Sequence, residues 1–231
     1  MKNVELPFIK DMFDTIAPTY DFLNRLLSLR QDVYWRKKLV SSLALPDGAC
    51  VLDVACGTGD VMMEIARQRQ NAWVVGVDFA SNMLELAGKK IYPSVSAGLA
   101  AANALHLPFG SRTFDAVTIA FGIRNIGDKL TALQEFYSCL KPGGCLGVLE
   151  LATPENRLLL SAYLTYFQKI LPAIGGFFSR QIKAYRYLPE SVVNFPKPAV
   201  FAGLMRQAGF MHIRWQPMTM GIVNLYIGYK A

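Results

Sequence analysis

The chain has 231 residues, of which 52% are hydrophobic and 18% are charged, and its formal net charge is +7. This length fits one globular domain of ~100–200 residues with additions, and the composition excludes disordered, collagen-like and coiled-coil proteins. The basic excess is compatible with three kinds of partner, namely a nucleic acid, an anionic membrane surface or an acidic small molecule.

The sequence offers little for metal binding or membrane insertion. Its four cysteines form no C-x-x-C pair and its only histidines are His106 and His212, so we expect no metal site and reduced, buried thiols. The N-terminus has no apolar core of signal-peptide length. The most apolar stretch, 158–178, is interrupted by polar residues, a proline and glycines, whereas a span needs ~20 nearly uninterrupted apolar residues. We therefore expect a cytoplasmic protein.

Strands and helices are predicted to alternate through most of the chain. Residues 1–45 predict a helical arm. Apolar, β-branched runs then predict strands at 50–54, 73–77, 116–121 and 145–151, with a weaker, alanine-rich strand at 99–102. Helical spacing between the strands predicts helices at 60–70, 82–90 and 129–140. This alternation is typical of a parallel sheet covered by helices on both faces.

The remaining segments predict additions to that sheet. Residues 141–144 (KPGG) predict a turn between a helix and a strand, and 212–218 with 223–229 predict an antiparallel hairpin across 219–221. Composition shifts sharply in 154–200, which we interpret as an insertion. One domain, 1–231, is therefore expected to comprise an arm (1–45), a core (46–153), a lid insertion (154–200) and a C-terminal helix and hairpin (201–231).

The segment after the first strand predicts a ligand-binding turn. Asp53 lies in the strand, and Gly57-Thr58-Gly59 follows it and precedes a helix. Glycines permit a tight turn and close approach of a ligand, and the N–H groups of the helix favour an anionic group. Met62 stands where a G-x-G-x-x-G motif requires glycine, which weakens a nicotinamide interpretation without excluding it. The structural alternative is a plain turn that needs two glycines.

Polar residues also follow the next two strands. Asp78 ends the second strand, 25 residues after Asp53, where a carboxylate accepts hydrogen bonds from ribose hydroxyls; the alternative is a solvated acid. Asn103-Ala104 follows the third strand and could face an adenine edge. Together they predict a nucleotide-like ligand.

These motifs, with Leu107-Pro108-Phe109, Phe114-Asp115 and the KPGG turn, resemble the class I S-adenosylmethionine-dependent methyltransferases. The resemblance implies an α/β fold: a Rossmann-like seven-stranded sheet with helices on both faces and its last strand antiparallel. The arm precedes this sheet, and the helical insertion follows strand five. It also implies S-adenosyl-L-methionine as the cofactor. Ala55 stands where that superfamily often has glycine, so this turn is expected to be less open.

Five further strings resemble one family, the menaquinone/ubiquinone-biosynthesis C-methyltransferases. They are 13–24 (FDTIAPTYDFLN), 35–36 (WR), 121–125 (FGIRN), 185–191 (YRYLPES) and 221–223 (GIV). The resemblance implies methylation of a polyprenylated quinol ring. The Phe195-Pro196 element favours demethylmenaquinol, while a polyprenyl benzoquinol of ubiquinone biosynthesis stays open as the alternative.

The resemblance places the family's cofactor contacts on Thr58, Asp78, Asn103 and Ala104. Ala120 falls where the family often has serine, so only its backbone could contact the cofactor. With the glycine turn, the predicted cofactor site comprises Asp53, Gly57, Thr58, Gly59, Asp78, Asn103, Ala104 and Ala120.

Ring methylation requires an electron-rich ring in line with the methyl group, a stabilised oxyanion and exclusion of water. Arg124 and Asn125 follow the fourth strand, at the edge where such sheets bind ligands. Because arginine stays protonated, we predict that Arg124 stabilises the quinolate oxygen and Asn125 orients it. The structural alternative is an ion pair between Arg124 and Asp128.

The sequence does not choose the proton acceptor. Tyr185 completes the predicted catalytic set of Arg124, Asn125 and Tyr185. The competing candidates for proton handling are Tyr187, Glu150, Tyr20 and Asp21.

The basic excess concentrates in 155–200, which has six Lys or Arg residues, two acids and eight aromatic residues. Such a segment is expected to rest on an anionic membrane, at the inner face of the cytoplasmic membrane; the alternative is a solvated basic face. An RNA-binding or RNA-modifying protein is the alternative from another class, but no RNA module is present and we expect no nucleic-acid partner. A non-enzymatic cofactor-binding protein and a homo-oligomer stay open.

Overall fold

One mixed sheet of seven strands runs through the protein in the order β3-β2-β1-β4-β5-β7-β6. The computed structural model describes residues 6–166 and 182–231, with backbone alone at residues 6, 8 and 182–186. Strands β1 to β5 pair in parallel, and β7 lies antiparallel between β5 and β6. The strands are β1 (Cys50–Val54), β2 (Trp73–Asp78), β3 (Ala97–Ala101), β4 (Phe114–Ala120), β5 (Leu140–Leu151), β6 (Met211–Met218) and β7 (Val223–Tyr229).

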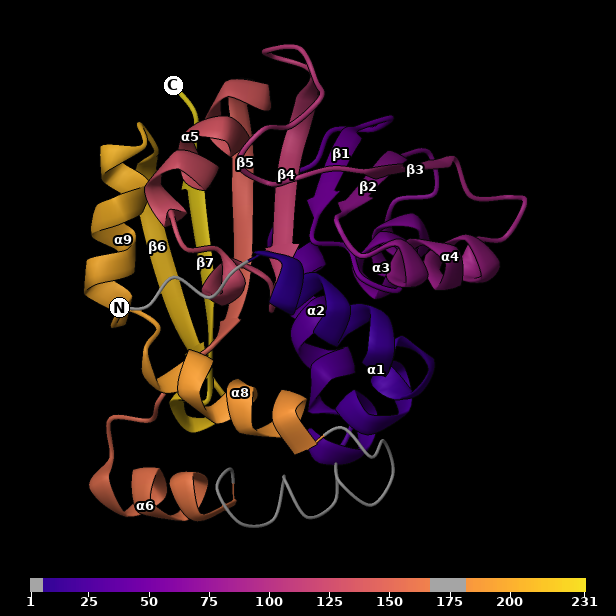
Figure 1. The fold of residues 1–231 in the computed structure, drawn as a ribbon. Helices are drawn as coiled ribbons and strands as arrows, with labels where there is room; N and C mark the ends of the chain where they lie inside the picture. Colours follow the sequence, from indigo (N-terminus) through magenta and orange to yellow (C-terminus); the bar gives the residue numbers. More distant parts are fainter. Residues whose placement is uncertain (1–5, 167–181) are drawn as a thin grey trace.

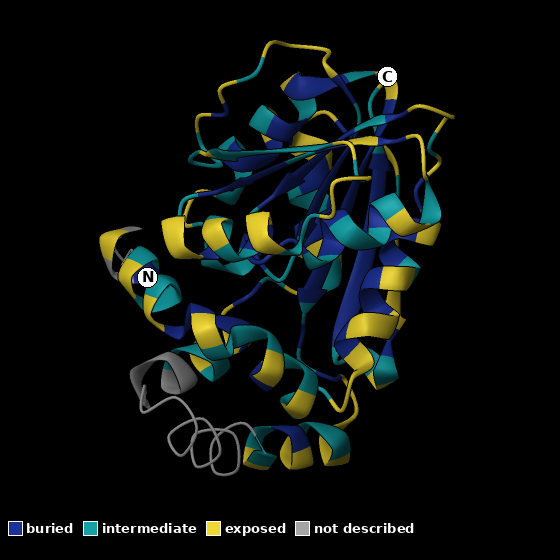
Figure 2. Ribbon diagram, turned by 90° about the vertical axis from the view of Figure 1, so that its right-hand side faces the viewer, coloured by how far each residue is buried: buried dark blue, intermediate teal, exposed yellow. Residues whose placement is uncertain are grey.

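Helices cover both faces of this sheet, with their outer sides exposed (Figure 1, Figure 2). On one face, α2 (Gln31–Ser41) and α3 (Asp60–Gln68) pack on alternate strand residues that include Val51 and Leu149. On the other face, α5 (Lys129–Cys139) and α9 (Pro198–Gln207) pack on Leu52 and Val148. Successive side chains of a strand point to opposite faces, which is why a strand buried on both sides is apolar throughout. The predicted fold class is confirmed.

The main difference from the predicted elements lies at the start of β5. The KPGG sequence at 141–144 predicted a turn, but β5 begins at Leu140, directly after α5. Gly143 has a φ of +76°, and its N–H donates to the Lys230 carbonyl at 3.1 Å. The Gly144 carbonyl accepts from the Lys230 N–H at 2.9 Å. Pairing with the end of the chain therefore makes the turn sequence the irregular first part of a strand.

The arm and the insertion meet at the carboxyl edge of the parallel strands (Figure 1). Helix α1 (Leu6–Leu27) of the arm shares a buried apolar cluster with α4 (Ser81–Lys90), α6 (Arg157–Thr165) and α8 (Ile182–Val193). Helix α9 starts before residue 201, so the predicted boundary between the insertion and the C-terminal segment cuts through this helix. None of the described helices combines the length and the hydrophobicity that crossing a membrane requires.

Candidate active site

The glycine turn after β1 forms one wall of a cavity of about 350 Å³ at the carboxyl edge of the sheet. Gly57 and Gly59 have φ values of +55° and +82°, which glycine adopts readily. A Cβ at Gly59 would stand 3.3 Å from the Cβ of Ala87, so this glycine also allows α3 and α4 to approach each other. Gly57 lines the cavity, and Gly59 does not.

Polar groups from β2 and from the segment after β3 face this cavity. Asp78 lines it, and its carboxylate accepts backbone N–H groups of Gly57 at 2.8 Å and of Ala80 at 2.9 Å. Burial raises the pKa of Asp78, while these N–H groups oppose that shift. Asn103 and Ala104 also line the cavity, as does Ala120 at the end of β4.

Asp53, predicted as part of the cofactor site, is buried and does not line the cavity. Its Oδ1 accepts the Thr118 hydroxyl at 2.7 Å, and its Oδ2 has no hydrogen-bond partner among the described residues. Burial raises the pKa of Asp53 to about 7, although the Thr118 hydrogen bond opposes this. Asp53 therefore joins β1 to Thr118 of β4 and lies outside the cavity lining.

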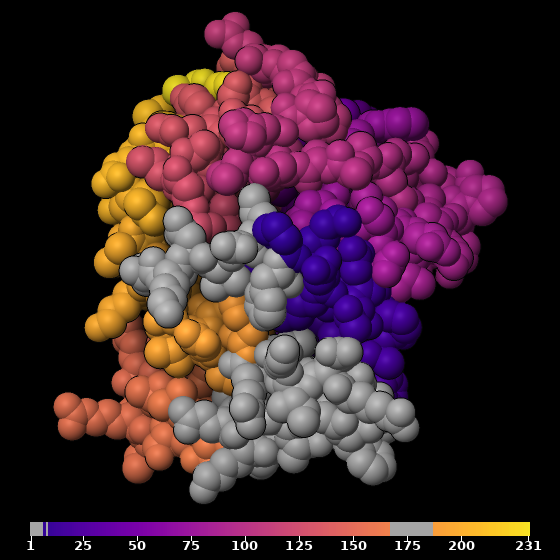
Figure 3. All heavy atoms as spheres, in the orientation of Figure 1, coloured from indigo at the N-terminus to yellow at the C-terminus, as the bar shows by residue number. Residues whose placement is uncertain are grey.

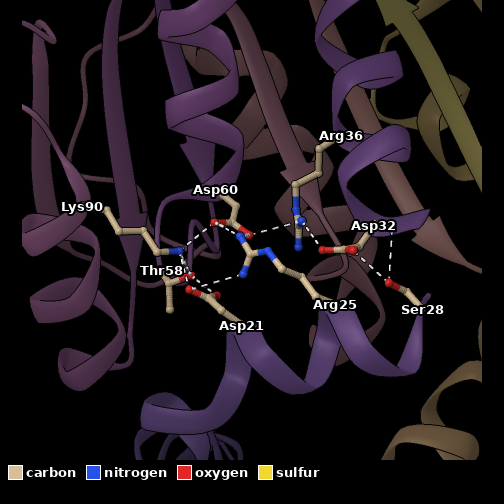
Figure 4. Close-up of polar contacts among 8 residues, drawn as sticks. All are labelled: Asp21, Arg25, Ser28, Asp32, Arg36, Thr58, Asp60 and Lys90. Carbon is tan, nitrogen blue, oxygen red and sulfur yellow. Dashed lines mark hydrogen bonds and ion pairs between the residues drawn. The ribbon is translucent and has the colours of Figure 1, made fainter. Parts of the chain in front are cut away.

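Thr58 faces the arm instead of the cavity. Its hydroxyl donates to Asp21 of α1 at 2.6 Å and accepts from Lys90 of α4 at 2.9 Å (Figure 4). The cofactor contact that the resemblance places on Thr58 therefore stays a prediction, and the structure gives its hydroxyl two contacts within the protein.

A network of charged side chains joins the arm to the helix that follows the glycine turn (Figure 4). At its centre, Asp60 accepts from Lys90 at 2.6 Å and from Arg25 at 3.3 Å, and pairs with Arg36 at 3.2 Å. Arg36 also donates to Asp32 at 2.6 Å. Burial opposes ionisation of Asp60, but the surrounding cations lower its pKa below the ordinary value. Three acids balance three bases: Asp21, Asp32, Asp60, Arg25, Arg36 and Lys90.

Helix α1 closes the cavity from the side of the arm. Ile9, Phe13 and Tyr20 of this helix line the cavity. In Figure 3 the arm (indigo) lies below the purple and magenta atoms of the half of the sheet that carries the glycine turn. The arm was predicted as helical, but its place over the cavity was not; the family string at 13–24, which contains Phe13 and Tyr20, was the available signal.

A second, mainly apolar cavity of about 600 Å³ adjoins the first. Both cavities share Phe13, Tyr20 and Phe121 as lining residues. The second is walled by α1, α2, α6 and α8, with apolar side chains that include Ile16, Leu23, Leu27, Leu151, Leu159, Leu188 and Ile222. The arrangement therefore offers two sites with one common boundary. The first, called the polar cavity below, sets the polar groups of Asp78, Asn103 and Asn125 in a partly apolar lining, and the second is mainly apolar.

Arg124 and its partner lie beside the apolar cavity. Arg124 lines it, and its Nη1 is 2.8 Å from Oε1 of the fully buried Glu150. Burial opposes the charge of Arg124, but Glu150 keeps its pKa raised, so the guanidinium stays protonated. The alternative pair with Asp128 is wrong, because Asp128 caps α5 by accepting the Thr131 N–H at 3.0 Å.

Asn125 lines the polar cavity and accepts the Tyr187 hydroxyl at 3.1 Å. Tyr185 lies in α8, but its side chain is outside the described residues. Asp21 belongs to the charged network, and Tyr20 lines both cavities. Burial raises the pKa values of Tyr20 and Tyr187.

Two other predictions concern metal and membrane contact. Within the described part of the chain, no group of three His, Cys, Asp or Glu side chains is arranged to hold a metal ion. Of the basic residues in 155–200, Lys169 and Arg180 lie outside the described residues, as do the side chains of Lys183 and Arg186.

Comparison with known proteins identifies the family. A sequence model of the ubiE/COQ5 methyltransferase family matches residues 1–230. The chain belongs to this family. The fold and the family strings in the arm, after β4 and in α8 are those of a ubiE/COQ5 methyltransferase.

Individual relatives agree with this assignment. The ubiquinone/menaquinone biosynthesis C-methyltransferase UbiE of Geobacter sulfurreducens is 47% identical over 227 residues, which cover 96% of this chain and 88% of the relative. The demethylmenaquinone methyltransferase of Thermus thermophilus is 44% identical over 218 residues, which cover 94% of this chain and 99% of the relative.

Solved structures share the fold of this ubiE/COQ5 methyltransferase at low sequence identity. An S-adenosylmethionine-dependent methyltransferase of Thermotoga maritima has a TM-score of 0.65 at 19% identity, covering 96% of this chain and 99% of that chain. Phosphoethanolamine N-methyltransferase 2 of Haemonchus contortus, in complex with S-adenosyl-L-methionine, has a TM-score of 0.63 at 16% identity. The match covers 84% of this chain and 52% of that chain.

Proposed function

We propose that this ubiE/COQ5 methyltransferase transfers a methyl group from S-adenosyl-L-methionine to a ring carbon of a polyprenylated quinol, converting demethylmenaquinol to menaquinol. The observation that carries the proposal is the common boundary of the two cavities at Phe13, Tyr20 and Phe121. A polar cofactor and an apolar quinol bound on either side would place the donor methyl beside the acceptor ring. The names of relatives from Geobacter sulfurreducens and Thermus thermophilus support the quinone substrate.

The polar cavity fits the cofactor by the chemistry of its residues. Asp78, Asn103 and Ala104 line this cavity, where the carboxylate would accept hydrogen bonds from ribose hydroxyls and the other two residues would border the adenine edge. Asp53 is buried next to the glycine turn with its pKa raised to about 7, so a cationic group bound nearby would favour its ionised form. When bound, S-adenosyl-L-methionine supplies an electrophilic methyl group.

The residues beside the common boundary suit activation of a quinol. Arg124 stays protonated and stabilises negative charge on the quinol oxygen, and Asn125 supplies an amide that orients this oxygen. Burial raises the pKa values of Tyr20 and Tyr187, so both phenols stay protonated near neutral pH. Neither tyrosine is therefore suited to act as the base. Asp21 is engaged by Lys90 in the charged network, so Glu150 is the remaining described candidate, and its pairing with Arg124 makes the two a single unit.

We also propose that the protein works at the cytoplasmic face of an anionic membrane. Leu29 lines the apolar cavity and is 83% exposed, and Leu158 at the start of α6 is 84% exposed. Apolar side chains at the mouth of an apolar cavity suit a substrate whose polyprenyl tail stays in lipid. Arg30 and Arg157 are exposed next to these leucines in sequence and add positive charge that anionic headgroups attract.

The direct test incubates purified protein with labelled S-adenosylmethionine and either reduced demethylmenaquinone or the corresponding polyprenyl benzoquinol. Label in the naphthoquinol supports the proposal, and label in the benzoquinol alone would assign the protein to ubiquinone biosynthesis. Label in neither lipid would remove the proposed function.

An Arg124→Lys variant tests the role of the guanidinium. Lysine keeps the positive charge opposite Glu150 but lacks the planar guanidinium with its fixed set of N–H donors. Turnover should therefore fall about tenfold or more while the fold is retained. Turnover near the wild-type value would contradict the proposed role of Arg124.

A further inference from the structure

Tyr187 links the insertion to the catalytic edge of the sheet. It lies in α8, and its hydroxyl is 3.1 Å from Oδ1 of Asn125, in the 3-10 turn Ile123–Asn125 that follows β4. Asn125 lines the polar cavity, whereas Tyr187 lines the apolar cavity. The hydrogen bond between them therefore crosses from one cavity wall to the other.

The direction of this hydrogen bond follows from the charges around it. Burial raises the pKa of Tyr187, although the positive charge of Arg124 opposes this, so the phenol keeps its proton at neutral pH. Next to a cation, a hydroxyl is most stable with its oxygen toward the charge and its hydrogen directed away. The Tyr187 hydroxyl thus donates, and the Asn125 carbonyl oxygen accepts.

A carboxamide has two chemically different ends, an acceptor oxygen and a donor NH₂ group. Rotation by 180° exchanges these ends with little change in shape, so packing alone does not fix which end faces a ligand. A donor on one side fixes the oxygen there, which leaves the NH₂ of Asn125 to donate on the other side. A quinolate oxygen accepts hydrogen bonds, so only this orientation is useful for the proposed reaction.

We propose that Tyr187 is a positioning residue for methyl transfer: its hydroxyl holds the Asn125 amide with the NH₂ group directed into the polar cavity, where it meets the oxygen of a quinol ring that reaches across the common boundary to the donor methyl. This inference rests on the proposed function. Its consequence is that the site is complete only when α8 is in place. The neighbouring Leu188 lines the same cavity, and Val192 is buried in the cluster that contains Ile16 and Tyr163, so packing on both sides fixes the position of α8.

The test compares two tyrosine-to-phenylalanine variants. Tyr187→Phe removes the hydroxyl that reaches Asn125. The matched control, Tyr137→Phe, removes a hydroxyl on α5, where the ring packs against Phe210 at 5.2 Å and lines neither cavity. We expect Tyr187→Phe to lower kcat about five- to tenfold, with the KM for S-adenosylmethionine within about twofold of wild type. Tyr137→Phe should keep kcat within about twofold.

A double-variant cycle separates positioning from general packing. If Tyr187 acts through the amide, Tyr187→Phe should cause no further loss of kcat in an Asn125→Ala background. Independent, additive losses would overturn the inference, and so would a Tyr187→Phe variant that melts at a lower temperature but turns over like wild type. Wild-type protein that transfers no methyl group to either quinol would instead remove the proposed function and this inference with it.

Discussion

At the residue scale, two residues that line the polar cavity have strained backbone conformations. Ala55 and Phe121 have φ values of +52° and +58°, a conformation that side chains other than glycine adopt at a cost of about 1–2 kcal/mol. Both residues line the polar cavity. The Phe121 ring is 6.0 Å from the Trp35 ring and 5.9 Å from the Arg36 guanidinium carbon, so α2 holds it from behind. Such strain persists where surrounding structure fixes it, and it is concentrated at functional sites.

The contact between Ala55 and Gly122 yields a paired prediction. A Cβ on Gly122 would stand 2.7 Å from the Ala55 Cβ, so Gly122→Ala should lower the free energy of unfolding by about 2 kcal/mol. Ala55→Gly removes that methyl group and the left-handed strain, so it should restore much of the loss in the double variant. Urea unfolding of the three variants measures this. A double variant no more stable than Gly122→Ala alone would contradict the explanation.

The buried Asp53 predicts a pH dependence. Its pKa rises from the ordinary 3.8 to about 7 because it is buried, so between these values the folded state holds a proton that the unfolded state releases. Increasing pH through this range therefore destabilises the folded protein. Asp53→Asn should remove this contribution and be more stable than wild type at pH 8, by on the order of 2 kcal/mol, with a smaller difference at pH 4.

Urea unfolding at both pH values, without added cofactor, tests the Asp53 prediction. A difference between the two proteins that does not change with pH would show that Asp53 is ionised in the folded state.

At the element scale, the arm is fastened to the helix that follows the glycine turn. Arg36 of α2 is buried and meets both Asp32 and Asp60. Removing one partner of a buried ion pair leaves the other charge uncompensated. The network therefore makes the closed arm a strong determinant of stability as well as a wall of the cavity.

Arg36→Met should destabilise the protein by about 3 kcal/mol, because it leaves the Asp32 and Asp60 carboxylates without their shared guanidinium. The matched control is Arg67→Met on α3, where the exposed arginine pairs with Glu64 at 2.6 Å. This control should leave the unfolding midpoint unchanged. Equal effects of the two substitutions, measured by urea unfolding, would argue against a special role of the arm network.

At the scale of the whole molecule, the two cavities set where substrate enters. The apolar cavity opens beside Leu29, at the carboxyl edge where α1, α6 and α8 gather (Figure 1). The amino edge of the sheet lies at the opposite end, and carries exposed residues such as Met211 at the start of β6. Only the first end suits contact with the lipid from which a polyprenylated quinol must be drawn.

Vesicle binding tests this orientation. Leu29→Asp should weaken co-sedimentation with vesicles of anionic phospholipid about tenfold, because it replaces an inserted apolar side chain by a charge of the same sign as the lipid. Met211→Asp makes the same change in charge at the opposite edge and should bind like wild type. Equal binding of both variants, or binding that is independent of anionic lipid and of salt, would exclude the proposed membrane face.

The sequence alone determined the alternation of strands and helices, the glycine turn, and the polar residues Asp78 and Asn103 at strand ends. These features depend on local periodicity, on backbone conformations that neighbouring residues prefer, and on the rule that parallel strands end at one edge. The family strings carried the resemblance over nearly the whole chain, so the family and the class of reaction were accessible without coordinates.

Only the tertiary structure decided which side chains meet. It turned Thr58 toward Asp21 and paired Asp53 with Thr118. It also gave Arg124 the partner Glu150, which is 26 residues away, instead of a neighbour within one helical turn. The fold also pairs three bases with three acids in the network around Asp60, which leaves the whole net charge of +7 on the rest of the chain. Contacts of this kind depend on how distant segments pack, because a side chain pairs with whatever opposite charge the fold brings within reach, and local sequence does not encode that.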